Sequence, residues 1–142
     1  MNQTAEKFGY PASLLREYDA WAVLLRPVQV TLGSLVLVCR EPVEAFGQIS
    51  ETAASELKRA VADIESALGE AFSFDRINYL MLMMVDPDVH FHVLPRYAEQ
   101  RAFEGRTHRD EAWPGPPRIT ADLGLSEAEH DALLAHLRPF FS

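Results

Sequence analysis

The chain has 142 residues, of which 48% are hydrophobic, and it carries a formal net charge of −8 at pH 7. This length favours one domain, residues 1–142, with a core of its own. The acidic balance argues against a general nucleic-acid binder, which would usually present a basic face. No apolar run reaches the roughly 18 residues that a membrane span needs.

Two further features bear on the cellular compartment. The lone cysteine, Cys39, cannot form an internal disulfide, which fits a reducing environment. The first residues show neither the basic nor the apolar region of an export signal. We therefore expect a cytoplasmic protein that binds neither nucleic acid nor a membrane.

The first half of the chain predicts a short helix, two strands and a long helix. Residues 11–17 begin with a proline, which favours the first turn of a helix. The apolar runs 21–25 and 35–39 are typical of buried strands, and the turn at 32–34 indicates an antiparallel pair. Residues 41–47 predict another short helix. Ser50 is a suitable N-cap for a long helix whose apolar face is Leu57, Val61, Ile64, Leu68 and Phe72.

The second half begins with a predicted strand at 77–85, apolar on both faces and therefore expected at the centre of a sheet. Asn78 is its unusual residue, because asparagine is disfavoured in strands. A tight turn at 86–88 follows. Residues 97–118 show no periodicity, and loops of this length in a small domain are often functional. Ser126 and Glu129 form a capping-box pattern, which predicts a helix ending by Pro139.

Residues 88–96 form the most informative stretch. Alternation along a strand places three apolar residues on one face: Val89, Phe91 and Val93. Asp88, His90 and His92 share the opposite face, and Arg96 follows with the same parity. Same-face neighbours on a strand lie about 6.5–7 Å apart, so both imidazoles could contact one phosphate or chelate one metal ion.

The pattern leaves several points open. Asn78 joins the histidine face only if the paired residue numbers of the two strands sum to an even value. A metal site would need a third ligand, which Asp88 could supply, but no other ligand pair has metal spacing. A serine hydrolase is less favoured, because no Gly-x-Ser-x-Gly elbow is present.

The stretch Val89-His90-Phe91-His92-Val93-Leu94-Pro95-Arg96 resembles the signature of the histidine-triad (HIT) nucleotide hydrolases and transferases. In that signature three histidines alternate, followed by apolar residues and often Pro-Arg. Asn78 matches the family's site asparagine, and residues 32–38 match its glycine-containing strand. The resemblance covers residues 18–96, and segments 78–81 and 113–117 look like a bacterial subgroup. It implies a HIT-like α+β fold, in which an antiparallel sheet packs against a long amphipathic helix. The core would span about residues 11–96, and residues 97–142 would add an irregular segment and a C-terminal helix.

The resemblance also implies roles for individual residues. His90 matches the middle histidine, the nucleophile that attacks the α-phosphate of a small purine nucleotide and forms a nucleotidyl-histidine. His92 matches the third histidine, which helps to bind phosphate oxygens. Asn78, Ser34 and Arg96 are expected to bind the substrate. The family implies a homodimer acting on a small nucleotide, with no metal ligands and no cofactor.

Two positions depart from the family pattern. Asp88 stands at the first triad position, and Ser34 stands where many members have a histidine. We group Asp88 with His90 and His92 as catalytic, because it could orient a histidine or donate a proton. As a carboxylate it would favour imidazolium over the neutral nucleophile. Two alternatives therefore remain: a HIT-fold nucleotide-binding protein with little or no turnover, and a small metalloprotein that uses His90 and His92.

Overall fold

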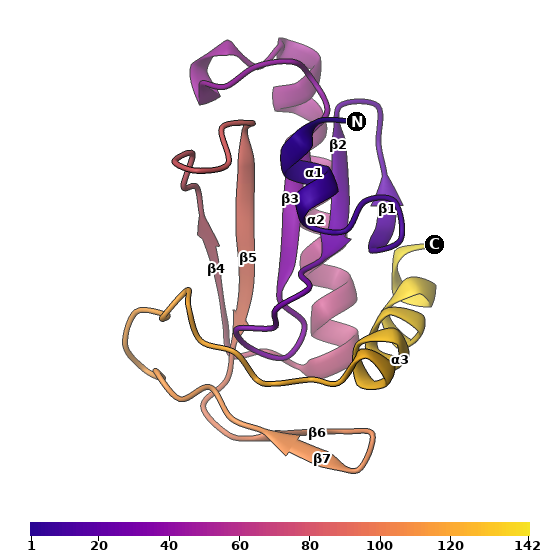
Figure 1. Ribbon diagram of the computed structural model, residues 1–142, viewed down its shortest axis with the longest axis vertical. Coiled ribbons are helices and arrows are strands. Elements are labelled where there is room, and N and C mark those ends of the chain that lie inside the picture. The colour runs from indigo at the N-terminus through magenta and orange to yellow at the C-terminus, as the bar shows by residue number, and fades with distance from the viewer.

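A five-stranded antiparallel sheet with helices on both faces forms the centre of the computed structural model, which describes residues 1–142 (Figure 1). The strand order is β1 (Leu14–Glu17), β2 (Trp21–Leu25), β3 (Leu35–Cys39), β5 (His90–Arg96) and β4 (Arg76–Leu80). The histidine strand β5 therefore has a partner on each side. The expected α+β architecture, a sheet packed against a long helix, is confirmed.

The main core lies on one face of the sheet, beneath α2 (Glu51–Phe72) and α3 (Glu127–Leu137). As the apolar periodicity predicts, α2 buries Ile64, Leu68 and Phe72 against the sheet. The Ser50 side chain caps the helix by accepting from the Ala53 N–H at 3.0 Å. The predicted capping box begins α3, and a short 3₁₀ turn, η2 (Arg138–Phe141), follows that helix.

The histidine face of the sheet carries the short helix α1 (Gln3–Lys7), which lies in front of the strands in Figure 1. Ala5 and Phe8 pack there on even-numbered residues of β2 and β3: Ala22, Leu24, Val36 and Val38. The register explains this arrangement, because Leu24 pairs with Val36 and Val36 pairs with His92. Successive residues of each strand point to opposite faces, so the odd-numbered residues enter the main core.

Three local expectations are wrong. Residues 11–17 form no helix, because Leu14–Glu17 pairs with β2 as strand β1. The strand expected at 77–85 ends at Leu80. It lies at the edge of the sheet and not at its centre. Instead Ile77 and Tyr79 pack against the main core, while Met84 and Val85 are exposed in the following loop. Within 41–47 the only helical structure is the start of a 3₁₀ turn, η1 (Phe46–Gln48).

The segment without periodicity contains a small hairpin, β6 (Arg101–Phe103) and β7 (Arg106–His108). Its turn uses positive φ at Glu104 and Gly105. After the hairpin the chain passes the ends of β4 and β5 before it reaches α3 (Figure 1). None of the helices combines the length and the apolar character that crossing a membrane requires.

Candidate functional site

The backbone fixes the tautomer of His90. Its Nδ1 lies 2.6 Å from the carbonyl oxygen of Asp88. Because a carbonyl only accepts hydrogen bonds, Nδ1 carries a proton. In the neutral ring the lone pair then lies on Nε2, which is buried and has no hydrogen-bond partner. That tautomer offers the one free ring nitrogen that nucleophilic attack requires.

His92 adopts the opposite tautomer. Its Nδ1 accepts from Nε of Arg26 at 3.4 Å, and since a guanidinium only donates, the proton of His92 lies on Nε2. Burial, followed by the charge of Arg26, lowers the pKa of His92 from 6.5 to about 4. The ring is therefore neutral at pH 7. The two imidazoles lie edge to face, with their centroids 5.1 Å apart, so the site presents one acceptor and one donor nitrogen.

Arg26 belongs to the candidate site, although the sequence pattern did not predict it. It follows β2 two residues after Leu24, so its side chain points to the same face of the sheet as Leu24 and His92. Its Nη1 donates to the Val28 carbonyl at 2.6 Å, and no carboxylate forms an ion pair with it. Burial lowers the pKa of the guanidinium. The sequence did contain a signal for Arg26. It is a charged residue directly after a buried strand, and its even number places it on the face that carries His90 and His92.

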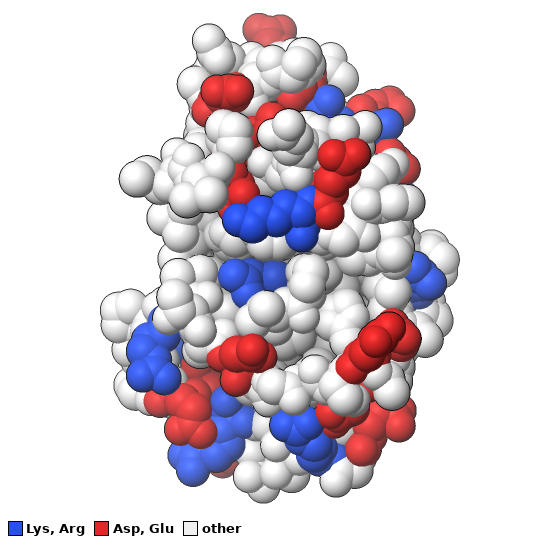
Figure 2. Space-filling view, viewed as in Figure 1, with Lys and Arg blue, Asp and Glu red and all other residues white.

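A groove of about 740 Å³ opens beside His92. It is lined by residues of α1 and its C-cap, the end of β2, the β4–β5 loop and the segment before α3: Lys7, Phe8, Arg26, Pro27, Val28, Leu82, Met84, Val85, Asp86, His92, Ile119 and Thr120. The volume lies in the range of about 300–1,000 Å³ that is common for small-molecule sites. Figure 2 shows basic and acidic side chains interspersed over this face, with a basic area in a recess near its centre. The charged residues that line the groove are Lys7, Arg26 and Asp86, so two basic side chains face one acidic side chain there.

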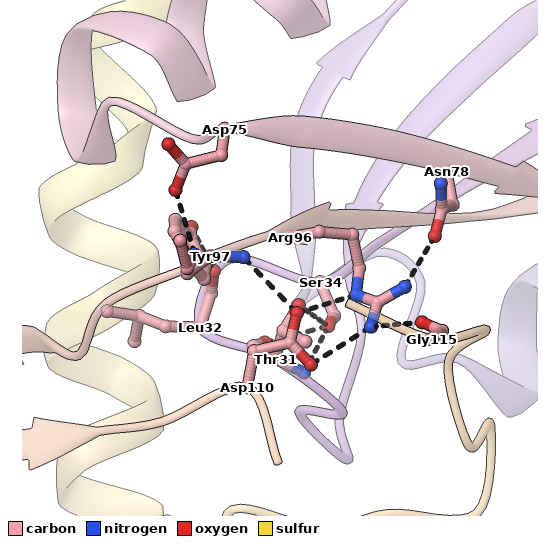
Figure 3. Close-up of polar contacts among 10 residues, drawn as sticks. Thr31, Leu32, Ser34, Asp75, Asn78, Arg96, Tyr97, Asp110 and Gly115 are labelled. Carbon is pink, nitrogen blue, oxygen red and sulfur yellow. Dashed lines mark hydrogen bonds and ion pairs between the residues drawn. The ribbon is translucent and has the colours of Figure 1, made fainter. Parts of the chain in front are cut away.

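Asn78 and Arg96 form a second polar cluster (Figure 3). Asn78 pairs with Leu94, an even sum, so it does share the histidine face. Its Oδ1 accepts from Nη1 of Arg96 at 2.8 Å, and Arg96 also donates to Asp110 at 2.6 and 3.1 Å and to the Gly115 carbonyl at 2.9 Å. These residues line a separate groove of about 480 Å³ with Trp113–Pro116. Their observed partners hold the 109–116 segment against the sheet.

Ser34 and Asp88 also have partners within the chain. The fully buried Ser34 hydroxyl donates to the Thr31 carbonyl at 2.7 Å and accepts from the Thr31 N–H at 2.9 Å. The Asp88 carboxylate accepts from the N–H and the hydroxyl of Thr4, at 3.3 and 2.9 Å. The roles predicted for Ser34, Asn78, Arg96 and Asp88 toward a substrate stay predictions, and His92 alone of the six predicted residues lines the groove.

The metal alternative lacks a ligand set. His90 and His92 lie on one face of β5, but no group of three or more histidine, cysteine, aspartate or glutamate side chains is placed to hold a metal ion. A stable site generally needs three or four protein ligands. The Asp88 carboxylate, which the sequence offered as a third ligand, is hydrogen-bonded to Thr4.

Comparison with known proteins gives a fold. No protein-family model matches the chain, and no curated protein matches it in sequence. A histidine triad protein from Marinobacter aquaeolei VT8 superposes with a TM-score of 0.76 at 23% identity, covering 99% of this chain and 96% of its own. One from Bradyrhizobium japonicum gives 0.75 at 19% identity, covering 100% and 97%. A hypothetical histidine triad nucleotide-binding protein from Sulfolobus tokodaii gives 0.68 at 17%, covering 91% and 83%. The chain therefore has the HIT fold.

Proposed function

We propose that this chain is a nucleotide hydrolase or nucleotidyl transferase that acts on the α-phosphate of a small purine nucleotide. The substrate class is a dinucleoside polyphosphate or a nucleoside phosphoramidate. The observation that carries the proposal is the pair of opposite tautomers on β5. His90 keeps a free lone pair at Nε2, and His92 offers an N–H at the groove.

The proposed reaction divides one displacement into two. The lone pair of His90 Nε2 attacks the α-phosphorus, a P–N bond forms, and the bond from phosphorus to the leaving group breaks. Water, or another acceptor in a transferase, then attacks the same phosphorus and breaks the P–N bond. The electron pair of that bond returns to Nε2, which restores the imidazole, and the proton that the acceptor loses passes to solvent. Nδ1–H of His90 continues to donate to the Asp88 carbonyl oxygen, which stabilises the positive charge that the ring gains.

The groove supplies the complementary charge. His92 Nε2–H donates to a phosphate oxygen, and Arg26 beside it contributes a cation without a carboxylate partner. Lys7 lines the same groove and pairs with Asp86 at 2.9 Å. Hydrogen bonds from charged donors to phosphate are roughly twice as strong as neutral ones. The apolar walls, Phe8, Val28 and Met84 among them, are suited to a purine base.

The decisive experiment is to incubate the protein with diadenosine polyphosphates and adenosine phosphoramidate and to trap a nucleotidyl-histidine for peptide mass spectrometry. The adduct is expected on the peptide that carries His90. His90→Ala should abolish both adduct and turnover, whereas His108→Ala, which replaces a buried histidine in β7, should retain them. Full activity in His90→Ala would refute the mechanism.

A nucleotide-binding protein with little turnover is the second candidate, and one observation favours it. His90 is fully buried, and Phe8 lies over its ring at a centroid distance of 6.1 Å. Tight binding of AMP without cleavage of any nucleotide tested, unchanged in Asp88→His, would establish this candidate over a weakened enzyme.

The proposed assembly is a homodimer. Strand β4 lies at an edge of the sheet and so has one free row of backbone groups, and the loop after it exposes Leu82, Met84 and Val85. Edge strands with exposed apolar neighbours are suited to pairing with a second chain. Light scattering on a sizing column would give the mass of a dimer, and a monomer at micromolar concentration would contradict this part of the proposal.

A further inference from the structure

The N-terminal helix covers the proposed nucleophile. Phe8, the C-cap of α1, packs tilted over His90 with centroids 6.1 Å apart and edge-on to His92 at 5.5 Å. Ala5 of the same helix is completely buried on the sheet beside it. With α1 in this position, His90 has no exposed surface and its Nε2 has no hydrogen-bond partner. A phosphate in the groove would therefore reach His92 before it reached His90.

Few polar contacts hold α1 in place. A helix of five residues is far too short to be stable alone, so its position depends on tertiary contacts. The Asp88 carboxylate accepts two hydrogen bonds from Thr4, and Asn2 donates to the Cys39 carbonyl at 2.9 Å. Two of the anchoring residues, Asp86 and Asp88, lie in the loop just before the nucleophile strand β5.

Asp88 contacts both the helix and the nucleophile. Its side chain binds Thr4 of α1, and its backbone carbonyl holds Nδ1 of His90. We propose that Asp88 is a positioning residue that controls access to His90 through α1: while its carboxylate holds Thr4, Phe8 covers the imidazole, and His90 meets a phosphate only when α1 shifts. This inference rests on the proposed function for the identity of the phosphate. The accessibility of His90 can be measured whether or not that function is right.

An anionic ligand has a way to promote this shift. Lys7 lines the groove and is the α1 partner of Asp86, at 2.9 Å. A phosphate that recruits the Lys7 ammonium competes with Asp86 for it and removes one of the contacts that hold the helix. The remaining anchor on this segment is the pair of hydrogen bonds between Thr4 and Asp88.

Histidine labelling of the full chain tests the role of Asp88 directly. Diethyl pyrocarbonate modifies accessible neutral imidazoles, and peptide mass spectrometry reports each site separately. His136 is exposed on α3, and His108 is buried in β7 with an unpartnered Nε2 but lies outside α1 and its contacts. In the wild type His90 should react as slowly as His108 and far more slowly than His136.

The variants remove the anchor in two ways. Thr4→Val deletes the hydroxyl that binds Asp88, and Asp88→Ala deletes the carboxylate but keeps the carbonyl that holds His90. Loss of a hydrogen bond to a charged group changes an equilibrium roughly 10- to 100-fold. We therefore expect His90 to react roughly 10- to 100-fold faster in each variant, with His108 unchanged. Thr4→Ser keeps the hydroxyl and should react at the wild-type rate.

The labelling rates distinguish the possible results. Faster labelling of His90 alone in either deletion variant supports the positioning role. This holds even if the protein cleaves no nucleotide, because the labelling needs no substrate. The proposal is overturned if His90 already reacts as fast as His136 in the wild type, or if neither variant accelerates His90 more than His108.

Discussion

Replacing Asp110 by alanine would leave the guanidinium of Arg96 buried without a counter-charge. The side chains are 4% and 3% exposed, and two donor–acceptor distances of 2.6 and 3.1 Å make the pair bidentate. Removing one partner of a buried ion pair typically costs about 3–5 kcal/mol. The Asn78 and Gly115 oxygens still accept from Arg96 after the change, so we expect the lower part of this range, about 3 kcal/mol.

The measurement is equilibrium unfolding in urea. With a typical slope of about 1–3 kcal/mol/M, a loss of 3 kcal/mol lowers the unfolding midpoint by roughly 1–3 M without changing the slope. Asp131→Ala, at an exposed position of α3, is the matched control and should leave the midpoint in place. Arg96→Met combined with Asp110→Ala should be less destabilised than Asp110→Ala alone, because no buried charge remains.

A loss below about 1 kcal/mol in Asp110→Ala, the range of a surface ion pair, would contradict the assignment of Arg96 and Asp110 as a buried structural pair. It would mean that the guanidinium reaches water or another acceptor when Asp110 is absent. Arg96 would then be available to a ligand, as the sequence pattern first indicated. The stability measurement thus distinguishes a structural clamp from a substrate-binding arginine.

Three further predictions follow from the groove and the turn before β3. Arg26→Gln should weaken the binding of AMP roughly 10- to 100-fold in calorimetry, because a charged hydrogen bond contributes about 1.5–3 kcal/mol, while Arg59→Gln on α2 should not. The pKa of His92 is lowered in the folded chain, so the neutral ring stabilises the fold at high pH, and this contribution is lost as the pH falls from 6.5 to about 4. His92→Asn should therefore flatten the decline of the urea midpoint between those pH values. Gly33→Ala should lower the melting temperature, since φ is +89° and the new Cβ would lie 3.3 Å from α2 side chains, with a strain of about 1–2 kcal/mol.

The sequence predicts best where a pattern is long and local. The 22-residue helix α2 follows from its apolar spacing and its Ser50 cap, and α3 follows from its capping box. The alternation around His90 predicts a strand and assigns the histidines to one face, as observed. Periodicity is reliable in these segments because the same residues that bury the face also repeat over several turns or pleats.

Short segments are predicted poorly, because four or five residues do not define a period. The helix α1 and the strand β1 were missed for this reason, and Pro11 precedes a strand instead of a helix. The apolar run after Ile77 indicates burial, but its position at the edge of the sheet depends on which strand pairs with β5 on the other side. Strand neighbours far apart in sequence are chosen by packing, which the local pattern does not contain.

The two-faced histidine strand and the helices that back the sheet can be predicted from the sequence, because each depends on residues that are close together in the chain. The tautomers of His90 and His92 follow only from the tertiary structure. They depend on the Asp88 carbonyl and on Arg26, which lies 66 residues away from His92. The tertiary structure also pairs Arg96 with Asp110 and the Asp88 carboxylate with Thr4. Hydrogen-bonding groups take whichever partners the fold brings within reach, so the chemistry of a side chain becomes definite only when its distant neighbours are in place.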